Sequence, residues 1–389
     1  MMNSNRRDFL KLLSLFTLAG SAPLLQAQES KRNIDKDAPL RIGYLPITDA
    51  TPLLVAHSQK LFEKHGINVE KPVMFRSWAQ LVEAFLSGNV NLVHLLSPMS
   101  LWARYGSKAL VKAVMWNHLA GSALTVQPQI NTIEELAGKT VAIPFWYSIH
   151  NIVLQQILKK HNLSITEKEP KANEVKLTVM SPSDMVPALA SGVIAGFIVA
   201  EPFNALAENR GIGKVLRFSG DVWRDHACCL TLMHEQDVVE RPEWTQNIVN
   251  ALTEAQAFCV TNRADTAKIL ARENGYTPHE LKVLEDVLAP TEQQWANYIQ
   301  TSAIKHPEWH QERIGFQPYP FDSYMEELVK MLKETHIAGN NAFLQGLDPT
   351  QVARELNAPQ FVKKALEQGN YLETFGLQSG FNRVEQIVV

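Results

Sequence analysis

Few residues in this sequence have the types and spacing that chemistry requires. Cys228 and Cys229 stand side by side, and the other histidine, cysteine and carboxylate residues do not fall at strong metal-ligand spacings. A nucleophile elbow, a zinc-protease helix, a phosphate-binding loop and a dinucleotide-binding glycine pattern are all absent. A bridge between adjacent cysteines is strained, so we expect two small buried residues. The sequence therefore favours a binding protein over an enzyme, with no metal and no cofactor.

Polar side chains instead gather where predicted strands end and helices begin. Thr48 and Asp49 follow a strand at 41–46, and Ser97 and Glu201 each directly follow a short apolar strand. Ligands bind at this edge of an open α/β sheet. We therefore place these four residues in a ligand site. Helix capping is the alternative for Asp49, and capping or a hinge hydrogen bond is the alternative for Glu201.

Aromatic residues stand at two further junctions. Trp78 lies near the start of a predicted helix, and Phe145 and Trp146 come shortly before Ser148 and His150. Adjacent aromatic rings are hard to bury together, so at least one should face the ligand. Ser148 and the free N–H groups of the next helix would receive an anion, and His150 would add a hydrogen bond or a charge. Core packing of Trp78 and a structural role for His150 are the alternatives.

These junctions belong to a pattern that occurs twice. Residues 81–103 and 185–207 align without a gap, with Ser-Gly, Pro and Ala at equivalent positions. Each copy predicts a helix ending at glycine, a buried strand, and a proline that precedes a new helix. The matching upstream elements are strands at 41–46 and 140–144 and helices at 52–64 and 149–160. The repeat predicts an α/β protein with two similar lobes and a cleft, and chance similarity of short α/β units is the alternative.

The order of the predicted elements divides the chain into lobes. Residues 28–40 form a charged tether, residues 41–124 and 220–389 form lobe one, and residues 125–219 form lobe two. The helices predicted beyond Arg241 cover 242–261, 264–274, 277–288, 320–334 and 349–356. Residues 163–178 and 296–318 have the pattern of long connections, and residues 360–389 show no clear pattern of helices or strands.

Composition sets the broad class of the protein. A chain of 389 residues with 46% hydrophobic content can bury two cores. Its net charge of -3 gives no argument for nucleic acid or for an acidic membrane surface as a partner. Three cysteines supply no disulfide framework. We expect a monomer that does not bind nucleic acid.

The N-terminus predicts export. Residues 5–11, Asn-Arg-Arg-Asp-Phe-Leu-Lys, resemble a twin-arginine signal, an apolar stretch follows at 12–19, and Leu25-Gln26-Ala27 offers a cleavage point. The apolar stretch is far shorter than the ~20 residues that span a bilayer. We therefore expect residues 1–27 to be a signal peptide for the Tat export machinery and the mature protein to be periplasmic. A cytoplasmic protein with a chance Arg-Arg pair is the alternative.

Several short pieces together resemble a known family. They are Ile42-Gly43-Tyr44-Leu45-Pro46-Ile47-Thr48-Asp49, Leu61-Phe62-Glu63-Lys64-His65-Gly66, Ser77-Trp78-Ala79, His94-Leu95-Leu96-Ser97-Pro98-Met99, Pro182-Ser183-Asp184-Met185-Val186 and Glu201-Pro202-Phe203-Asn204-Ala205. The chain resembles the periplasmic substrate-binding proteins of nitrate, sulfonate, taurine and bicarbonate ABC importers. The resemblance implies a two-lobed type II periplasmic binding protein, each lobe a mixed sheet flanked by helices. It also implies an ABC permease and its ATPase as partners.

The resemblance favours the nitrate and bicarbonate branch, in which Trp78 and His150 match cleft residues. That branch implies a small anion as ligand. The chain departs from it where a Gly-Thr-His loop is usual, because Phe145 and Trp146 precede Tyr147-Ser148-Ile149-His150. This bulk leaves room for an aromatic or heterocyclic solute. Thiamine-pyrimidine-synthesising enzymes share the fold and have a cysteine-rich segment, and they are the enzymatic alternative.

Overall fold

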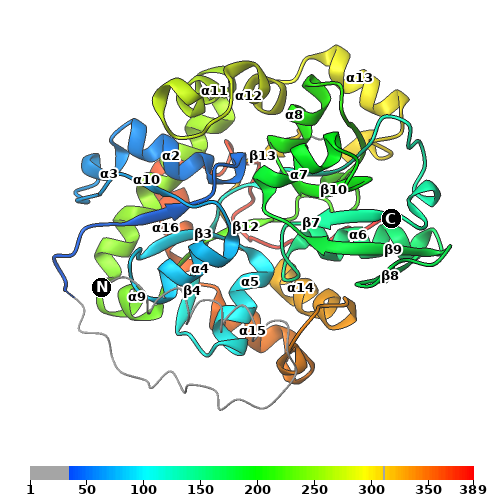
Figure 1. The fold of residues 1–389 in the computed structure, drawn as a ribbon. Helices are drawn as coiled ribbons and strands as arrows, with labels where there is room; N and C mark the ends of the chain where they lie inside the picture. The colour runs from blue at the N-terminus through cyan, green and yellow to red at the C-terminus, as the bar shows by residue number, and fades with distance from the viewer. Residues whose placement is uncertain (1–34, 310–311) are drawn as a thin grey trace, which may run out of the picture.

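The computed structural model describes residues 35–309 and 312–389 (Figure 1). The predicted signal peptide and residues 28–34 of the predicted tether lie outside the described residues. The described chain forms two separate sheets with helices packed around both, and a third, two-stranded sheet. Within the described ranges, no helix has both the length and the apolar content needed to cross a membrane.

The first sheet has the strand order β2-β1-β3-β12-β4. Its strands are β1 (Ile42–Tyr44), β2 (Val73–Met74), β3 (Leu92–Leu96), β4 (Val111–Trp116) and β12 (Cys229–His234). Strand β1 is parallel to both β2 and β3, whereas β12 runs antiparallel to β3 and β4. All five residues of β3 are buried, as its continuous apolar sequence predicts.

The second sheet repeats this arrangement. Its order is β11-β6-β10-β7-β9-β8. Its strands are β6 (Ser122–Val126), β7 (Thr140–Ile143), β8 (Ser164–Thr166), β9 (Glu174–Val179), β10 (Gly196–Ala200) and β11 (Lys214–Phe218). Strands β9, β7 and β10 are parallel, and β6 is antiparallel to β10 and β11. Apart from the additional edge strand β8, the strands of the second sheet have the same order and the same relative directions as those of the first sheet. The predicted two-lobed α/β fold is therefore confirmed.

The repeated helices begin and end where local signals place them. Helices α4 (Trp78–Leu86) and α7 (Pro182–Ala190) are each followed by a glycine with positive φ, Gly88 at 80° and Gly192 at 74°. Helix α6 (Ile149–Lys160) has the predicted bounds. The helix predicted at 52–64 is instead two helices, α2 (Thr51–Ser58) and α3 (Leu61–Lys64), because Lys60 adopts φ 56° between them. Helices α5 (Ser97–Leu101) and α8 (Phe203–Asn209) follow β3 and β10.

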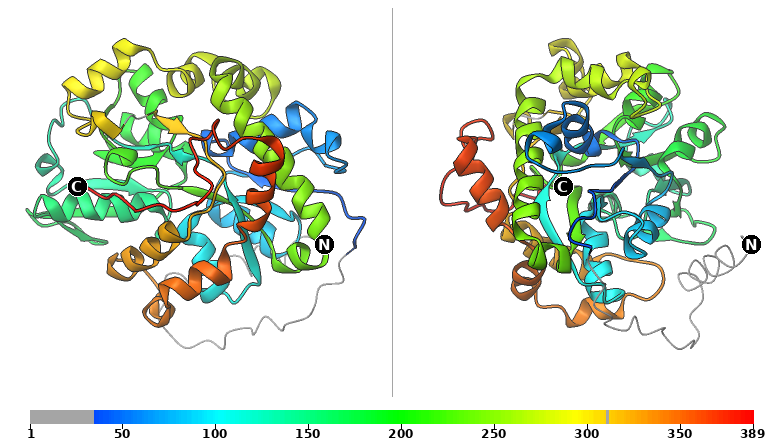
Figure 2. Two further views of the ribbon diagram at one scale, coloured as in Figure 1. Left: turned by 180° about the vertical axis from the view of Figure 1, so that it is seen from behind. Right: turned by 90° about the vertical axis from the view of Figure 1, so that its left-hand side faces the viewer.

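The rest of the chain is mostly helical and packs against the first sheet and the lobe interface (Figure 2). Its long helices are α9 (Glu235–Glu240), α10 (Pro242–Thr261), α11 (Arg263–Leu270), α12 (Leu281–Leu288), α13 (Glu292–Gln300), α14 (Asp322–Glu334), α15 (Pro349–Leu356) and α16 (Gln360–Gly369). Its strand β13 (Ile314–Gly315) pairs with β5 (Leu119–Ala120). The single-turn elements are η1 (Thr48–Ala50), η2 (Trp102–Gly106), η3 (Glu134–Leu136), η4 (Ser219–Asp221), η5 (Arg272–Asn274), η6 (Pro307–Trp309) and η7 (Ala342–Gly346).

The segments predicted as connections contain elements that sequence periodicity did not indicate. Strands β8 and β9 lie in 163–178, with β9 extending to Val179. The end of α13 and the whole of β13 lie in 296–318, and α16 lies in the final thirty residues. Strand β8 is at the sheet edge and β9 is next to it, and few of their residues are fully buried, so the apolar pattern is weak. The expectation of a long connection is therefore wrong for 163–178 and for the parts of 296–318 that α13 and β13 occupy.

Two segments connect the sheets. Residues 117–121 lead from β4 to β6, and residues 219–228 return from β11 to β12. The predicted boundary at 124/125 falls inside β6, and the boundary at 219/220 falls in the returning segment. The C-terminal segment runs beside this return, where Ile387 forms a β-bridge with Trp223 (Figure 2). The division into lobes by residue number stays a proposal.

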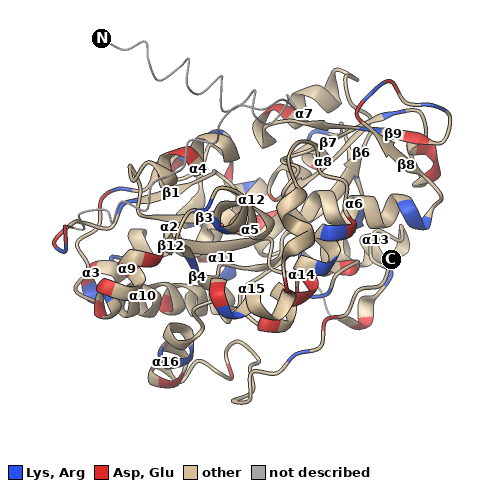
Figure 3. Ribbon diagram, turned by 90° about the horizontal axis from the view of Figure 1, so that it is seen from below, with Lys and Arg blue, Asp and Glu red and all other residues tan. Residues whose placement is uncertain are grey.

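Charged side chains lie around the outside of the molecule. Seen from below, lysine and arginine are interspersed with aspartate and glutamate along the outer helices and loops (Figure 3). The mixture agrees with the small net charge of -3. Several buried polar groups lie at the junction of the two sheets, among them Asp49, His118 and Glu201.

Candidate ligand-binding site at the lobe interface

The loop after β1 meets the end of β10 across the lobe interface. The backbone nitrogen of Thr48 donates to the carbonyl oxygen of Glu201 at 2.9 Å, and the Thr48 hydroxyl donates to the same oxygen at 3.1 Å. Both residues are buried. The structure therefore brings together two predicted site residues that are far apart in sequence, and the contact joins the two lobes directly.

Asp49 forms a buried ion pair with His118 from the first connecting segment. Asp49 Oδ2 lies 3.0 Å from His118 Nε2, and both side chains are fully buried. The alternative of capping is wrong for Asp49, because η1 begins after Ile47 without a side-chain cap. Burial raises the pKa of Asp49, and His118 partly offsets this. Burial by itself lowers the pKa of His118, but the Asp49 carboxylate outweighs burial and raises it to about 10.

The adjacent cysteines face this ion pair. All three cysteines of the chain are free and buried, which confirms the expectation of burial for Cys228 and Cys229. The Cys229 thiol donates to Asp49 Oδ2 at 3.4 Å, and Cys228 Sγ lies 3.8 Å from His150 Nε2. Burial raises the pKa of Cys228, but hydrogen bonds and charge from Cys229 and His150 outweigh it and hold that pKa well below its usual range. Burial and the neighbouring Cys228 raise the pKa of Cys229.

Two predicted site residues hold the cysteine segment in place. The Ser97 backbone nitrogen donates to the Cys228 carbonyl oxygen at 2.8 Å, and the Ser97 hydroxyl donates to the Ala227 carbonyl oxygen at 2.9 Å. His150 Nε2 lies 2.9 Å from the Ser122 hydroxyl, at the start of β6. Ser97 and His150 thus approach the cysteines from the two different sheets.

Trp78 is buried beside a neutral histidine of β3. Its ring lies 5.4 Å from that of His94, and Ser77 caps the helix that begins at Trp78. His94 Nε2 accepts a hydrogen bond from the Leu45 backbone nitrogen at 2.8 Å. Trp78 Nε1 has no hydrogen-bond partner among the described residues. Trp78 therefore forms part of the wall behind the Asp49 loop.

Acid should destabilise the packing around Trp78, because His94 is buried in its neutral form. Burial, with a smaller contribution from His118, lowers the pKa of His94 to about 3, whereas an unfolded histidine has a pKa near ~6.5. The unfolded chain therefore binds more protons, and the free energy of unfolding falls as pH falls from ~6.5 towards 3. In urea titrations over this range, His94→Gln will show a shallower pH dependence than the parent. The exposed His336→Gln is the control, and an equal change in it would contradict the assignment to His94.

The loop 145–148 packs against the C-terminal part of the chain. Trp146 contacts His336 edge to face at 5.5 Å, and Tyr147 stacks on Phe343 at 6.1 Å. Ser148 is the N-cap of α6: its hydroxyl accepts from Asn151 N at 3.1 Å and donates to Phe145 O at 2.6 Å. The Ser148 hydroxyl is thus engaged locally. Anion binding by Ser148 and a ligand role for Phe145 and Trp146 stay predictions.

Glu201 is neutralised by an arginine that the sequence did not indicate. Glu201 Oε1 accepts from Arg313 Nε at 2.9 Å and from Nη2 at 2.6 Å, while Oε2 accepts from Ala205 N at 3.2 Å. Arg313 also donates to Glu208 at 3.0 Å and to the Tyr298 hydroxyl at 2.6 Å. Glu201 Oε2 thus accepts from a backbone N–H in the first turn of α8, whose N-cap residue is Pro202. The ligand role of Glu201 and its capping or hinge alternative stay predictions.

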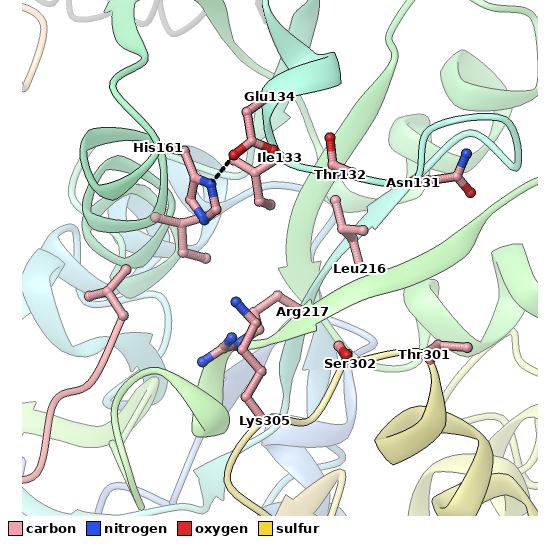
Figure 4. Close-up of a pocket in the computed structure, with 12 residues that line it drawn as sticks. Asn131, Thr132, Ile133, Glu134, His161, Leu216, Arg217, Thr301, Ser302 and Lys305 are labelled. Atoms are coloured by element: carbon pink, nitrogen blue, oxygen red, sulfur yellow. Dashed lines mark hydrogen bonds and ion pairs between the residues drawn. The ribbon is translucent and has the colours of Figure 1, made fainter.

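A surface pocket of about 260 Å³ lies away from this junction, between α6, β11 and the residues after α13 (Figure 4). Two of its charged groups, Glu134 and Arg217, have partners within the chain, His161 and Asp221. Its lining includes none of the predicted site residues, so we take the buried cluster as the candidate site.

Sequence reasoning missed four residues of the cluster as ligand-binding groups: His118, Ser122, Cys228 and Cys229. The sequence predicts Cys228 and Cys229 to be buried core residues, with a cysteine-rich segment like that of the thiamine-pyrimidine-synthesising enzymes as the alternative. His118 and Cys228 stand on the two connecting segments, so their position between the lobes was the available signal.

A model of the NMT1-like family matches residues 34–272, more than half of the chain. The chain belongs to the NMT1-like family. It is 28% identical over 238 residues to the nitrate import ATP-binding protein NrtC of Synechocystis sp., covering 58% of this chain and 35% of that protein. It is 23% identical over 290 residues to the nitrate/nitrite binding protein NrtA of Nostoc sp., covering 69% of this chain and 62% of NrtA. The chain thus spans about a third of the first relative and less than two thirds of the second.

A solved structure shows the same fold. The periplasmic nitrate-binding protein NrtA from Synechocystis PCC 6803 superposes with a TM-score of 0.69 at 16% identity, over 87% of this chain and 90% of that one. The expected periplasmic-binding-protein fold is confirmed. NrtA is a binding protein by name, as is the alkanesulfonate-binding protein SsuA from Xanthomonas axonopodis pv. citri, which superposes with a TM-score of 0.61 at 19% identity over 82% of this chain and 99% of that one.

Proposed function

We propose that this member of the NMT1-like family is the extracytoplasmic solute-binding component of an ABC importer. The observation that carries the proposal is the contact of the Asp49 loop with the end of β10, beside a polar cluster supplied by both sheets and both connecting segments. In a two-lobed protein, a solute bound at such a junction stabilises the closed state by binding it more tightly than the open one.

The solute class we propose is a small anion of the nitrate, bicarbonate or sulfonate class, and the names of the relatives support nitrate and sulfonate. The alternative is an aromatic or heterocyclic solute. Its stacking platform would be Phe145 and Trp146, and the contact of Trp146 with His336 makes that platform less accessible. The partners we propose are an ABC permease and its ATPase. Export through residues 1–27 by the Tat machinery to the periplasm, and a monomeric state, belong to the same proposal.

A thermal-shift screen tests the solute. Protein from residue 28 onward, refolded to remove bound ligand, would be heated with nitrate, bicarbonate, taurine, alkyl and aryl sulfonates, aromatic carboxylates and pyrimidines. A ligand at 100 times its dissociation constant stabilises the native state by about 2.7 kcal/mol. A shift with small oxyanions supports the anion class, and a shift with ring compounds alone supports the alternative. Recovery of the uncleaved full-length chain in the cytoplasm would contradict the exported role.

Loss of Trp78 or His150 should weaken capture of the solute. Both side chains are buried at the junction, Trp78 behind the Asp49 loop and His150 beside Cys228. We expect Trp78→Ala and His150→Ala to lower affinity at least about tenfold, or ~1.4 kcal/mol, in calorimetric titration with the solute found by the screen. Trp309→Ala, in η6, is the control. Parental affinity in both junction variants would show that the site lies elsewhere.

A further inference from the structure

Four side chains of different chemistry converge at the junction. Asp49, His118, Cys228 and Cys229 each place a potential metal-ligand atom within 4.8 Å of the others, and all four residues are fully buried. In a tetrahedral zinc site, ligand atoms ~2.0–2.3 Å from the ion lie roughly 3–4 Å from one another. The separations of 3.0 Å from Asp49 Oδ2 to His118 Nε2 and 3.4 Å to Cys229 Sγ are of this size.

Hydrogen bonds alone do not satisfy these groups. His118 Nε2 faces both Asp49 Oδ2 at 3.0 Å and the backbone N–H of Cys229 at 3.2 Å. The carboxylate requires a proton on Nε2, whereas the N–H requires a lone pair there, so the two contacts conflict. The second carboxylate oxygen, Asp49 Oδ1, is buried without a hydrogen-bond partner among the described residues. A cation that accepts lone pairs from imidazole and carboxylate together would remove both problems.

The surroundings hold the four groups in place. The Cys228 carbonyl oxygen accepts from Ser97 N at 2.8 Å, and the Cys229 carbonyl oxygen accepts from Asn117 N at 3.3 Å. His118 packs against Gly121, which has φ +82° and where a Cβ atom would lie 3.0 Å from His118 Nδ1. His150 Nε2, 3.8 Å from Cys228 Sγ, can donate to a thiolate. Such fixed outer contacts are typical of metal sites.

We propose that Asp49, His118, Cys228 and Cys229 form a binding site for a thiophilic transition-metal ion of the Zn²⁺ class. Two thiolates, an imidazole and a carboxylate suit tetrahedral zinc and exclude the hard ions Mg²⁺ and Ca²⁺, which bind oxygen ligands. The inference rests on the proposed function only in taking the junction as the place where solute binds. The metal would hold together the loop after β1, the start of β12 and the ends of the connecting segments that adjoin the first sheet.

Cobalt is the probe for this site. The mature protein, stripped with a chelator and reduced, would be titrated with Co²⁺ under anaerobic conditions. We expect one equivalent to give intense visible bands of tetrahedral Co²⁺ and a near-ultraviolet thiolate-to-cobalt charge-transfer band. Zn²⁺ should abolish both, and excess Mg²⁺ or Ca²⁺ should leave them unchanged. Octahedral bands, or the absence of a charge-transfer band, in the unmutated protein would overturn the proposal without any variant.

Variants identify the ligands. Cys228→Ser and Cys229→Ser should each weaken the charge-transfer band and lower metal affinity at least about tenfold, and Asp49→Asn should lower affinity while keeping the band. The matched control is Cys259→Ser, since Cys259 is equally buried but lies in α10 outside the cluster. Circular dichroism would establish that each variant is folded. Equal loss in Cys259→Ser would refute the assignment.

The two proposals can fail separately. If no metal changes the spectrum or the melting temperature while an anion of the screen does, the metal site is wrong and the solute-binding role stands. If Co²⁺ binds as expected but the full-length protein stays uncleaved in the cytoplasm, the importer role is wrong and the metal site stands.

Discussion

Replacing Arg313 with methionine will lower the free energy of unfolding by about 3–5 kcal/mol, the usual cost of removing one partner of a buried ion pair. The side chains of Arg313 and Glu201 are 1% and 0% exposed, and two guanidinium nitrogens contact one carboxylate oxygen. Without the arginine, the buried Glu201 would either carry an unpaired negative charge or bind a proton. Urea denaturation at pH 7, followed by circular dichroism, measures the effect.

Two further variants separate the charge from the packing. Adding Glu201→Gln to Arg313→Met should restore part of the loss, because the orphaned charge is then removed. Arg272→Met is the exposed counterpart: Arg272 pairs with Glu273 and Glu280, and its side chain is 56% exposed. Its expected cost is within ~1 kcal/mol. If Arg313→Met costs no more than Arg272→Met, the buried network does not stabilise the fold.

Replacing Trp116 with alanine will destabilise the protein by about 3–5 kcal/mol, as large-to-small changes of buried aromatic residues do. Trp116 ends β4, is 1% exposed, and its ring contacts Phe321 at 5.5 Å and Tyr324 at 5.0 Å, both edge to face. The Trp116 backbone nitrogen donates to Pro318 O at 2.9 Å, and the Trp116 carbonyl oxygen accepts from Gln256 Nε2 at 2.7 Å. The truncation leaves a cavity next to the segment that carries His118.

Urea denaturation followed by circular dichroism measures this loss of stability. Tryptophan fluorescence is not used, because the substitution itself removes a fluorophore. Trp116→Phe should cost less, since it keeps an aromatic ring against Tyr324. Trp309→Ala, at a half-buried site in η6, should cost less than half as much as Trp116→Ala. A loss of stability in Trp116→Ala similar to that in Trp309→Ala would mean that the cavity collapses and that the ring contacts contribute little.

Much of the fold could be predicted because its signals are local. Helices α6, α10 and α15 have the predicted bounds, and β3 and β10 are the buried strands that the repeat predicts, because apolar periodicity, prolines and C-terminal glycines act within a few residues. The repeat predicts two similar lobes, and the two sheets of the structure have equivalent strand orders. Thr48, Asp49, Ser97 and Glu201 were placed at the junction by the rule that ligands bind at the carboxyl ends of strands.

Tertiary structure decided what those residues contact. Asp49 and Cys229 are 180 positions apart, and Glu201 and Arg313 are 112 apart, so no local pattern relates them. Their contacts arise because two connecting segments and a C-terminal strand pass between the lobes, and that path depends on how the sheets pack. The sequence by itself determined the elements and the edge where a ligand would bind. Only the folded chain placed two thiols, an imidazole and a carboxylate at one point, because strand pairing brings the ends of β1 and β4 and the start of β12 to the same end of the first sheet.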